Sequence, residues 1–159
     1  MNTLCTDIAN LLLERGESVA TAESCTGGLI AKLLTDISGS SGWFERGVVT
    51  YSNLAKRDLL DVPSEILDSD GAVSEAAARC MAEGLLMSSP ADWGISVTGI
   101  AGPTGGTEAK PVGTVWIALL HRSRDALVRR YLFKGDRAQV REQTARAALE
   151  ELLKQLRHA

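Results

Sequence analysis

A serine lies in a glycine-rich turn between an apolar stretch and a helical pattern, and the turn reads Glu23-Ser24-Cys25-Thr26-Gly27-Gly28. Adjacent glycines permit tight turning and close backbone approach, and the helix that follows presents free N–H groups. Ser24 could attack a carbonyl whose developing negative charge rests on neighbouring amides. Alternatively, Ser24 or Thr26 simply caps the helix.

A serine hydroxyl needs a base, and the usual base, histidine, occurs only as His121 and His158. Lysine is the remaining candidate. Lys56 falls in the first turn of a predicted helix, where the helix dipole disfavours an ammonium. The dipole contributes only about 0.3–1 kcal/mol, so burial must supply most of a shift toward a neutral amine. The alternative is an exposed lysine on a helix surface.

Two neighbours of this pair also have chemistry of their own. Tyr51 ends the strand pattern before Lys56 and could hydrogen-bond the lysine or a substrate, or simply pack at the sheet edge. Cys25 lies near a helix N-terminus, where a thiol tends toward a lowered pKa and could itself be a nucleophile. A small buried residue at a crowded turn explains Cys25 equally well.

A long loop and two arginines are candidates for anion binding. Residues 99–111 contain four glycines and two prolines, without the order of a phosphate-binding P-loop. Loops of this length in compact domains are usually functional or disordered. Arg137 and Arg141, one helical turn apart near the start of the last helix, could grip a phosphate or form surface ion pairs.

Alternating apolar patterns predict the elements that position these residues. The periodicity predicts helices over 3–15, 29–37, 53–60, 73–87 and 137–156, and strands over 18–22, 47–51, 93–98, 114–120 and 126–133. Ser52 or Asn53 can cap the third helix, and Ser74 the fourth. Strands that alternate with helices and end in a hairpin predict a three-layer α/β/α sandwich with a mixed, mostly parallel sheet, in one domain over 1–159.

Composition excludes several classes of protein. The 159 residues are 45% hydrophobic with a net charge of −3, so we expect no nucleic-acid partner. No apolar run is long enough for a bilayer span or a signal peptide, which predicts a cytoplasmic protein without a membrane partner. Three cysteines and two histidines predict neither a disulfide framework nor a metal site. Residues 121–146 are locally basic. This segment is either a solvated surface or a local anion-binding site.

Five motifs follow one another along the chain: Ala22-Glu23-Ser24-Cys25-Thr26-Gly27-Gly28; 47–56 with Tyr51-Ser52-Asn53 and Lys56; Gly71-Ala72-Val73-Ser74; Thr98-Gly99-Ile100-Ala101-Gly102-Pro103; and Lys110-Pro111-Val112-Gly113-Thr114-Val115. Together they resemble the CinA C-terminal domain family over nearly the whole chain, in its standalone form. The resemblance implies hydrolysis of the carboxamide of nicotinamide mononucleotide to nicotinate mononucleotide and ammonia. It implies no cofactor. It also implies that the protein forms a homodimer or a higher homo-oligomer.

The resemblance also assigns roles to particular residues. The family's serine, lysine and tyrosine match Ser24, Lys56 and Tyr51 as catalytic residues. The matching substrate-binding residues are Cys25, Thr26, Gly27, Gly28, Thr98, Gly99, Arg137 and Arg141, with Arg137 favoured over Arg141 for direct contact. Two alternatives stay open: a catalytically silent nucleotide-binding or regulatory module, and a Ser/Lys amidase for another small amide.

Overall fold

The computed structural model describes residues 1–158. One sheet has the strand order β2-β1-β3-β4-β5, with bounds β1 Val19–Glu23, β2 Phe44–Val49, β3 Trp93–Gly99, β4 Thr114–His121 and β5 Leu127–Leu132. Strand β1 pairs in parallel with β2 and β3, whereas β4 pairs antiparallel with β3 and β5. Only β4 therefore runs against the other strands, and the predicted mixed sheet is confirmed.

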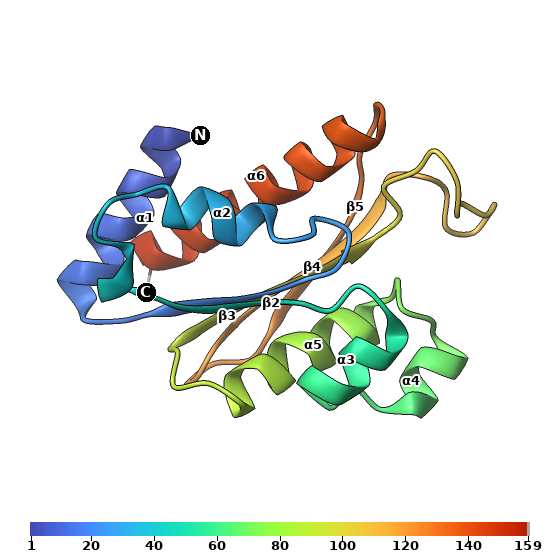
Figure 1. Cartoon of the computed structure of the whole chain (residues 1–159), viewed down its shortest axis with the longest axis horizontal. Helices are drawn as coiled ribbons and strands as arrows, with labels where there is room; N and C mark the ends of the chain where they lie inside the picture. Colours follow the sequence, from blue (N-terminus) through green and yellow to red (C-terminus); the bar gives the residue numbers. More distant parts are fainter. Residues whose placement is uncertain (159) are drawn as a thin grey trace.

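Helices cover both faces of this sheet. Their bounds are α1 Asn2–Arg15, α2 Leu29–Thr35, α3 Asn53–Leu60, α4 Ser64–Ser69, α5 Glu75–Met87 and α6 Arg137–His158. Helices α1, α2 and α6 lie on one face and α3, α4 and α5 on the other, which confirms the predicted three layers (Figure 1). All five residues of β1 are buried, as expected for a central strand covered on both sides.

The element boundaries follow the predicted caps closely. Gly16 ends α1 in the left-handed conformation, and Ser52, not Asn53, caps α3 by accepting from the Ala55 amide. Ser74 likewise caps α5 by accepting from the Ala77 amide. Helix α4 was not predicted, because six residues are too short to show a periodic pattern.

Strand β2 differs most from its predicted range of 47–51. It begins at Phe44, earlier than predicted, because Glu45 and Arg46 interrupt the apolar pattern while β2 continues along β1 with a shift in register at Glu45. It ends at Val49, because the backbone of Thr50 and Tyr51 turns toward Lys56, whose Nζ donates to both carbonyls. The residues that follow this strand, Thr50 and Tyr51, are part of the site described below.

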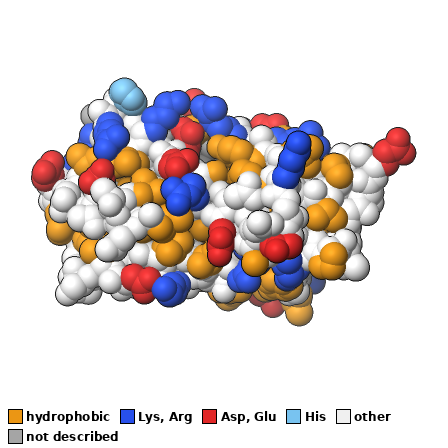
Figure 2. Space-filling view, turned by 90° about the horizontal axis from the view of Figure 1, so that it is seen from above, with side chains coloured by type: hydrophobic (Ala, Val, Ile, Leu, Met, Phe, Trp, Pro, Cys, Tyr) orange, Lys and Arg blue, Asp and Glu red, His pale blue; other side chains and the backbone are white. Residues whose placement is uncertain are grey.

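The molecular face above α1, α2 and α6 carries basic and acidic side chains mixed together. Figure 2 shows Lys and Arg interspersed with Asp and Glu there, rather than gathered into one basic patch. On α6 this mixture includes the pair Arg146–Glu150 at 3.6 Å, and Arg129 of β5 lies 3.6 Å from Glu151 of the same helix. Part of the basic excess of 121–146 is therefore ion-paired surface, whereas Arg122, Arg137 and Arg141 donate to backbone carbonyls.

Helix α3 packs on α5 through a glycine. A Cβ at Gly84 of α5 would overlap the backbone carbonyl oxygen of Leu60, the last residue of α3. Gly84 is buried, and no side-chain movement can relieve a clash with backbone. The position of α3, and with it that of Lys56, therefore depends on the absence of a side chain at Gly84.

We expect Gly84→Ala to lower the free energy of unfolding by about 1–3 kcal/mol, because α3 must move away from α5. Urea denaturation followed by circular dichroism measures this loss. Glu83→Ala, at an exposed position of the same helix, is the control and should change stability by less than about 0.5 kcal/mol. Equal stability of the two variants would show that the helices are not in this close contact.

Candidate active site

Ser24 immediately follows the central strand β1. Its amide donates to the Val97 carbonyl of β3 at 3.1 Å, so the sheet pairing continues to the serine itself. The side chain is 8% exposed. Because β2, β1 and β3 are parallel, the segments that leave their carboxyl ends meet at one edge of the sheet, where ligands of α/β proteins commonly bind.

Lys56 reaches Ser24 from the next strand-to-helix junction. Its Nζ lies 3.2 Å from Ser24 Oγ, 2.9 Å from the Thr50 carbonyl oxygen and 3.3 Å from the Tyr51 carbonyl oxygen. A neutral amine has two N–H donors and one lone pair. A neutral Lys56 that donates to the two carbonyls would keep its lone pair for the serine hydroxyl, which is the geometry that proton abstraction requires.

The environment of Lys56 favours the neutral amine. Its side chain is 1% exposed, and burial lowers the pKa of Lys56 below its ordinary value of 10.5 because an ammonium loses its hydration there. Within residues 1–158 no carboxylate lies within ion-pair distance of it. Arg57 is exposed and donates to Ser64 Oγ at 3.3 Å, so it points away from the site.

Glu23 braces the turn that carries the serine, and sequence reasoning missed this role. Its carboxylate is 1% exposed and accepts four hydrogen bonds. The donors are the hydroxyls of Thr21 at 3.3 Å and Thr26 at 2.7 Å and the amides of Ile30 and Ala31, both at 2.9 Å. A carboxylate at the helix N-terminus satisfies orphan amides and complements the helix dipole. The sequence feature that could have indicated this role is an acidic residue at the end of a buried strand.

Several predicted substrate-binding groups are already engaged within this turn. The Thr26 hydroxyl donates to Glu23, and the Gly27 amide donates to the Ser24 carbonyl at 3.0 Å. Arg141 donates from Nε to the Cys25 carbonyl at 3.1 Å and from Nη2 to the Thr26 carbonyl at 3.0 Å. Thr26, Gly27, Gly28 and Arg141 are not among the residues that line the site cavity. Hydrogen bonds of Thr26, Gly27 and Arg141 hold the turn together.

The cavity at this edge of the sheet has a volume of about 260 Å³. It is lined by Ser24, Cys25, Tyr51, Asn53, Lys56, Ala72, Gly99, Ile100, Ala101, Gly102, Thr104, Gly105 and Arg137. The predicted loop over 99–111 thus forms one wall. Asn53, in the first turn of α3, is a polar lining residue that sequence reasoning did not select.

Arg137 and Tyr51 are joined across the mouth of the cavity. Arg137 donates from Nη1 to the Gly102 carbonyl and from Nη2 to the Tyr51 hydroxyl, both at 2.9 Å. The tyrosine therefore meets Lys56 through its carbonyl and Arg137 through its phenol. Thr98 was expected to contact substrate, but its hydroxyl is 2.7 Å from the Ala72 carbonyl and the residue does not line the cavity. Gly99 does.

Cys25 lines the cavity but is not activated as a nucleophile. Burial raises the pKa of the Cys25 thiol to about 11, so the thiol stays protonated near neutral pH. The residue is 5% exposed. The simpler expectation for Cys25, a small buried residue at a crowded turn, agrees with this environment.

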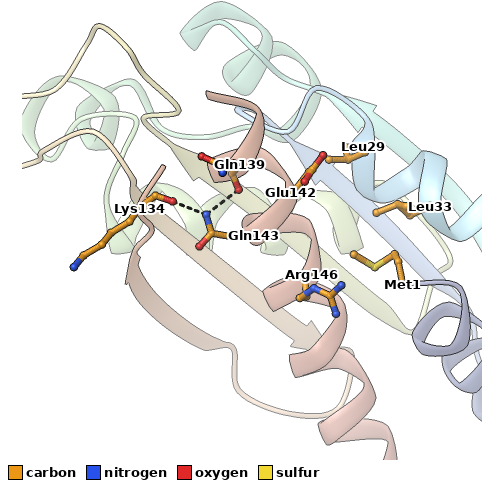
Figure 3. A pocket seen from close by; sticks show the side chains of 8 residues that line it. All are labelled: Met1, Leu29, Leu33, Lys134, Gln139, Glu142, Gln143 and Arg146. Carbon is orange, nitrogen blue, oxygen red and sulfur yellow. Dashed lines mark hydrogen bonds between the residues drawn. The ribbon is translucent and has the colours of Figure 1, made fainter. Parts of the chain in front are cut away.

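A larger cavity of about 600 Å³ lies between α2 and α6 (Figure 3). Its lining combines apolar residues such as Leu29 and Leu33 with polar residues of α6 such as Gln143 and Arg146. Its lining includes no serine or cysteine beside a base, so the candidate active site is the smaller cavity. In the described chain no group of His, Cys, Asp or Glu could hold a metal ion, and no helix is both long and apolar enough to cross a membrane.

The sequence model of the CinA C-terminal domain matches residues 1–156. The chain belongs to the CinA C-terminal domain family. It is 51% identical to nicotinamide-nucleotide amidohydrolase PncC of Escherichia coli (strain K12), over 96% of this chain and 92% of that protein. A CinA-like protein of Syntrophus aciditrophicus is 59% identical over 89% of this chain, which spans about a third (34%) of that longer protein.

Solved structures of family members have the same fold. A competence/damage inducible protein from Agrobacterium tumefaciens superposes with a TM-score of 0.94 at 46% identity, covering 96% of this chain and 93% of that one. A competence damage-inducible protein from Klebsiella pneumoniae superposes with a TM-score of 0.95 at 40% identity, covering 99% and 97%. The similarity of this chain to the family therefore extends from the sequence motifs to the backbone fold as a whole.

The lowered pKa of Lys56 predicts a dependence of stability on pH. Between that lowered pKa and about 10.5, the unfolded chain keeps the lysine proton while the folded chain has lost it, so the free energy of unfolding rises with pH. We expect Lys56→Met to lose this rise in urea denaturation at stepped pH. The control is Lys32→Met, at an exposed lysine of α2, which should keep it. Parallel curves for Lys56→Met and wild type would contradict a neutral buried amine.

Proposed function

We propose that this chain hydrolyses the carboxamide of nicotinamide mononucleotide to nicotinate mononucleotide and ammonia, with Ser24 as nucleophile and Lys56 as base. The observation that carries the proposal is the 3.2 Å approach of Lys56 Nζ to Ser24 Oγ, with the other two contacts of Nζ made to backbone carbonyls. It is supported by the 51% identity to PncC, whose name states a nicotinamide-nucleotide amidohydrolase.

Acylation begins when the neutral Lys56 amine accepts the Ser24 proton. The hydroxyl oxygen forms a bond to the carboxamide carbon, whose oxygen becomes negatively charged. The resulting ammonium then gives a proton to the departing nitrogen, the C–N bond breaks, and ammonia leaves. In the second half, Lys56 accepts a proton from water, whose oxygen attacks the ester carbon. Ser24 leaves with the proton returned by Lys56.

The oxyanion needs backbone donors that are not already engaged. Gly27, Ile30 and Ala31 donate to acceptors within the protein, so we assign this role to the other amides of the turn, those of Cys25, Thr26 and Gly28. Each such donor typically contributes on the order of 10²-fold or more to the rate. Ser24 at the end of β1 holds these amides next to the carbon that is attacked.

The nucleotide part of the substrate is assigned to the open side of the cavity. A guanidinium has five N–H donors, and Arg137 uses one on Gly102 and one on Tyr51. The remaining donors and the positive charge suit a phosphate. Tyr51 orients Arg137 through its phenol and Lys56 through its carbonyl, and Asn53 offers an amide to a sugar hydroxyl. Thr98 supports this wall from behind through Ala72.

Three broader expectations accompany this function. The chain is proposed to act in the cytoplasm, as one domain, and as a homodimer or higher homo-oligomer. The first two agree with the composition of the sequence, and the third follows only from the family resemblance. Sedimentation equilibrium of the purified chain measures the oligomeric state directly.

Removal of either member of the pair should stop ammonia release. We expect Ser24→Ala and Lys56→Ala each to lower kcat on nicotinamide mononucleotide by on the order of 10³-fold or more, with the fold and nucleotide affinity kept. Ammonia is measured by a coupled dehydrogenase assay, affinity by calorimetry, and the control is Lys32→Ala. Nucleotide binding by wild type without turnover would favour the silent module instead. Turnover retained in Ser24→Ala but lost in Cys25→Ala would transfer the nucleophile's role to the thiol.

A covalent intermediate should be open to a second nucleophile. We expect wild type with nicotinamide mononucleotide and hydroxylamine to release the hydroxamate along with nicotinate mononucleotide, because the amine competes with water for the acyl-serine. Mass spectrometry of the products measures the ratio. A panel of small amides at equal concentration tests the alternative substrate, since preference is a ratio of kcat/KM values. Direct attack by water would give no hydroxamate at any hydroxylamine concentration.

A further inference from the structure

We propose that Arg141 is a positioning residue for the nucleophile: its guanidinium fixes the peptide groups of the turn that carries Ser24, and it does not bind substrate. This inference rests on the proposed role of Ser24. Arg141 belongs to α6, and 116 residues separate it from Cys25, the first residue whose carbonyl it holds.

The two hydrogen bonds of Arg141 form a fork on successive carbonyls. Nε lies 3.1 Å from the Cys25 oxygen and Nη2 lies 3.0 Å from the Thr26 oxygen. A planar guanidinium holds two acceptors in a fixed relative geometry, which the ammonium of lysine does not do. Both carbonyls are therefore oriented toward α6.

Orientation of these carbonyls also sets the amides. In a trans peptide the C=O and the following N–H point in opposite directions. With the Cys25 carbonyl held toward α6, the Thr26 amide points away from α6, as its proposed role toward the oxyanion requires. With the Thr26 carbonyl held likewise, the Gly27 amide is directed to the Ser24 carbonyl, which it meets at 3.0 Å. Arg141 thus fixes two successive peptide groups that follow Ser24.

Glu23 holds the same turn from the other side. Its carboxylate accepts from the Thr26 hydroxyl and from the amides of Ile30 and Ala31 at the start of α2. The turn therefore lies between a buried anion on β1 and a cation on α6. Neither charged group lines the catalytic cavity. Glu23 is fully buried, whereas Arg141 is half-buried at the surface of α6, so Arg141 can be replaced without opening the core.

The test compares Arg141→Lys and Arg141→Met with Arg146→Met. Arg146 lies on the same helix in the wall of the larger cavity (Figure 3), paired with Glu150 at 3.6 Å, and serves as the control for loss of a helix arginine. We expect kcat on nicotinamide mononucleotide to fall about 10- to 100-fold in both Arg141 variants, since small misplacement of reacting groups costs this much. KM should stay within about threefold and Tm should match that of Arg146→Met.

Each other outcome overturns the proposal. A raised KM with unchanged kcat would make Arg141 a substrate-binding residue. A lowered Tm with kcat equal to that of Arg146→Met would make it merely structural. Full activity of Arg141→Lys would mean that charge alone, and not the fork, is what the turn requires.

Two readouts separate failure of this inference from failure of the proposed function. The rate of covalent labelling of Ser24 by a fluorophosphonate and the hydrogen exchange of the Gly27 amide need no amide substrate. We expect slower labelling and faster exchange in Arg141→Met than in Arg146→Met. If wild type is labelled but releases no ammonia, the substrate assignment fails while Arg141 is still tested. Identical labelling and exchange in the two variants would overturn the positioning role even if wild type is a fast amidase.

Discussion

A buried lysine amine within hydrogen-bonding distance of two backbone carbonyls and one serine hydroxyl is the interaction on which this site depends. In the proposed reaction the neutral amine of Lys56 donates to the carbonyls of Thr50 and Tyr51 and keeps its lone pair for Ser24 Oγ. A protonated amine in the same position would have lost its hydration without gaining a carboxylate partner. Burial that is unfavourable for the charged form is therefore also the condition that makes the amine a base.

The fold supplies this condition through two neighbouring strand ends. Strands β1 and β2 are parallel and adjacent, so the residues that follow them lie at the same edge of the sheet. Helix α3 then packs close to α5, at Gly84, and this buries Lys56 beneath the turn. On the opposite face, Glu23 and Arg141 connect the Ser24 turn to α2 and α6. The helices on one face of the sheet thus hold Lys56, and those on the other face hold the turn that carries Ser24.

The cavity that contains the candidate catalytic residues is not the larger of the two cavities described above. The cavity with the serine and the lysine is less than half the volume of the cavity between α2 and α6. A small site with a buried serine and lysine suits attack on a carboxamide, because electrostatic interactions are stronger away from water. The rest of a nucleotide must then extend past Tyr51 and Arg137 toward solvent. Longer CinA-like relatives carry a matching segment within a larger chain.

Sequence by itself determined the layers, most element boundaries and the types of the reacting residues. Apolar periodicity and capping residues act over a few positions, so Ser52, Ser74 and Gly16 ended or began their helices as predicted. Ser24 and Lys56 were identifiable because each lies at a strand-to-helix junction of a parallel sheet. The length and end of β2 were less well predicted, because contacts with Lys56 decide where that strand stops.

Only the tertiary structure decided which way the polar groups face. The Thr26 hydroxyl, the Gly27 amide and the Arg141 guanidinium look like ligand-binding groups in the sequence, yet each donates within the turn. The bracing role of Glu23 was missed. The physical reason is that these hydrogen bonds depend on the approach of segments far apart in the chain, such as Arg141 and Thr26, whose positions differ by 115 in the sequence. Local periodicity carries no information about that approach, which is set by how α6 packs against the sheet.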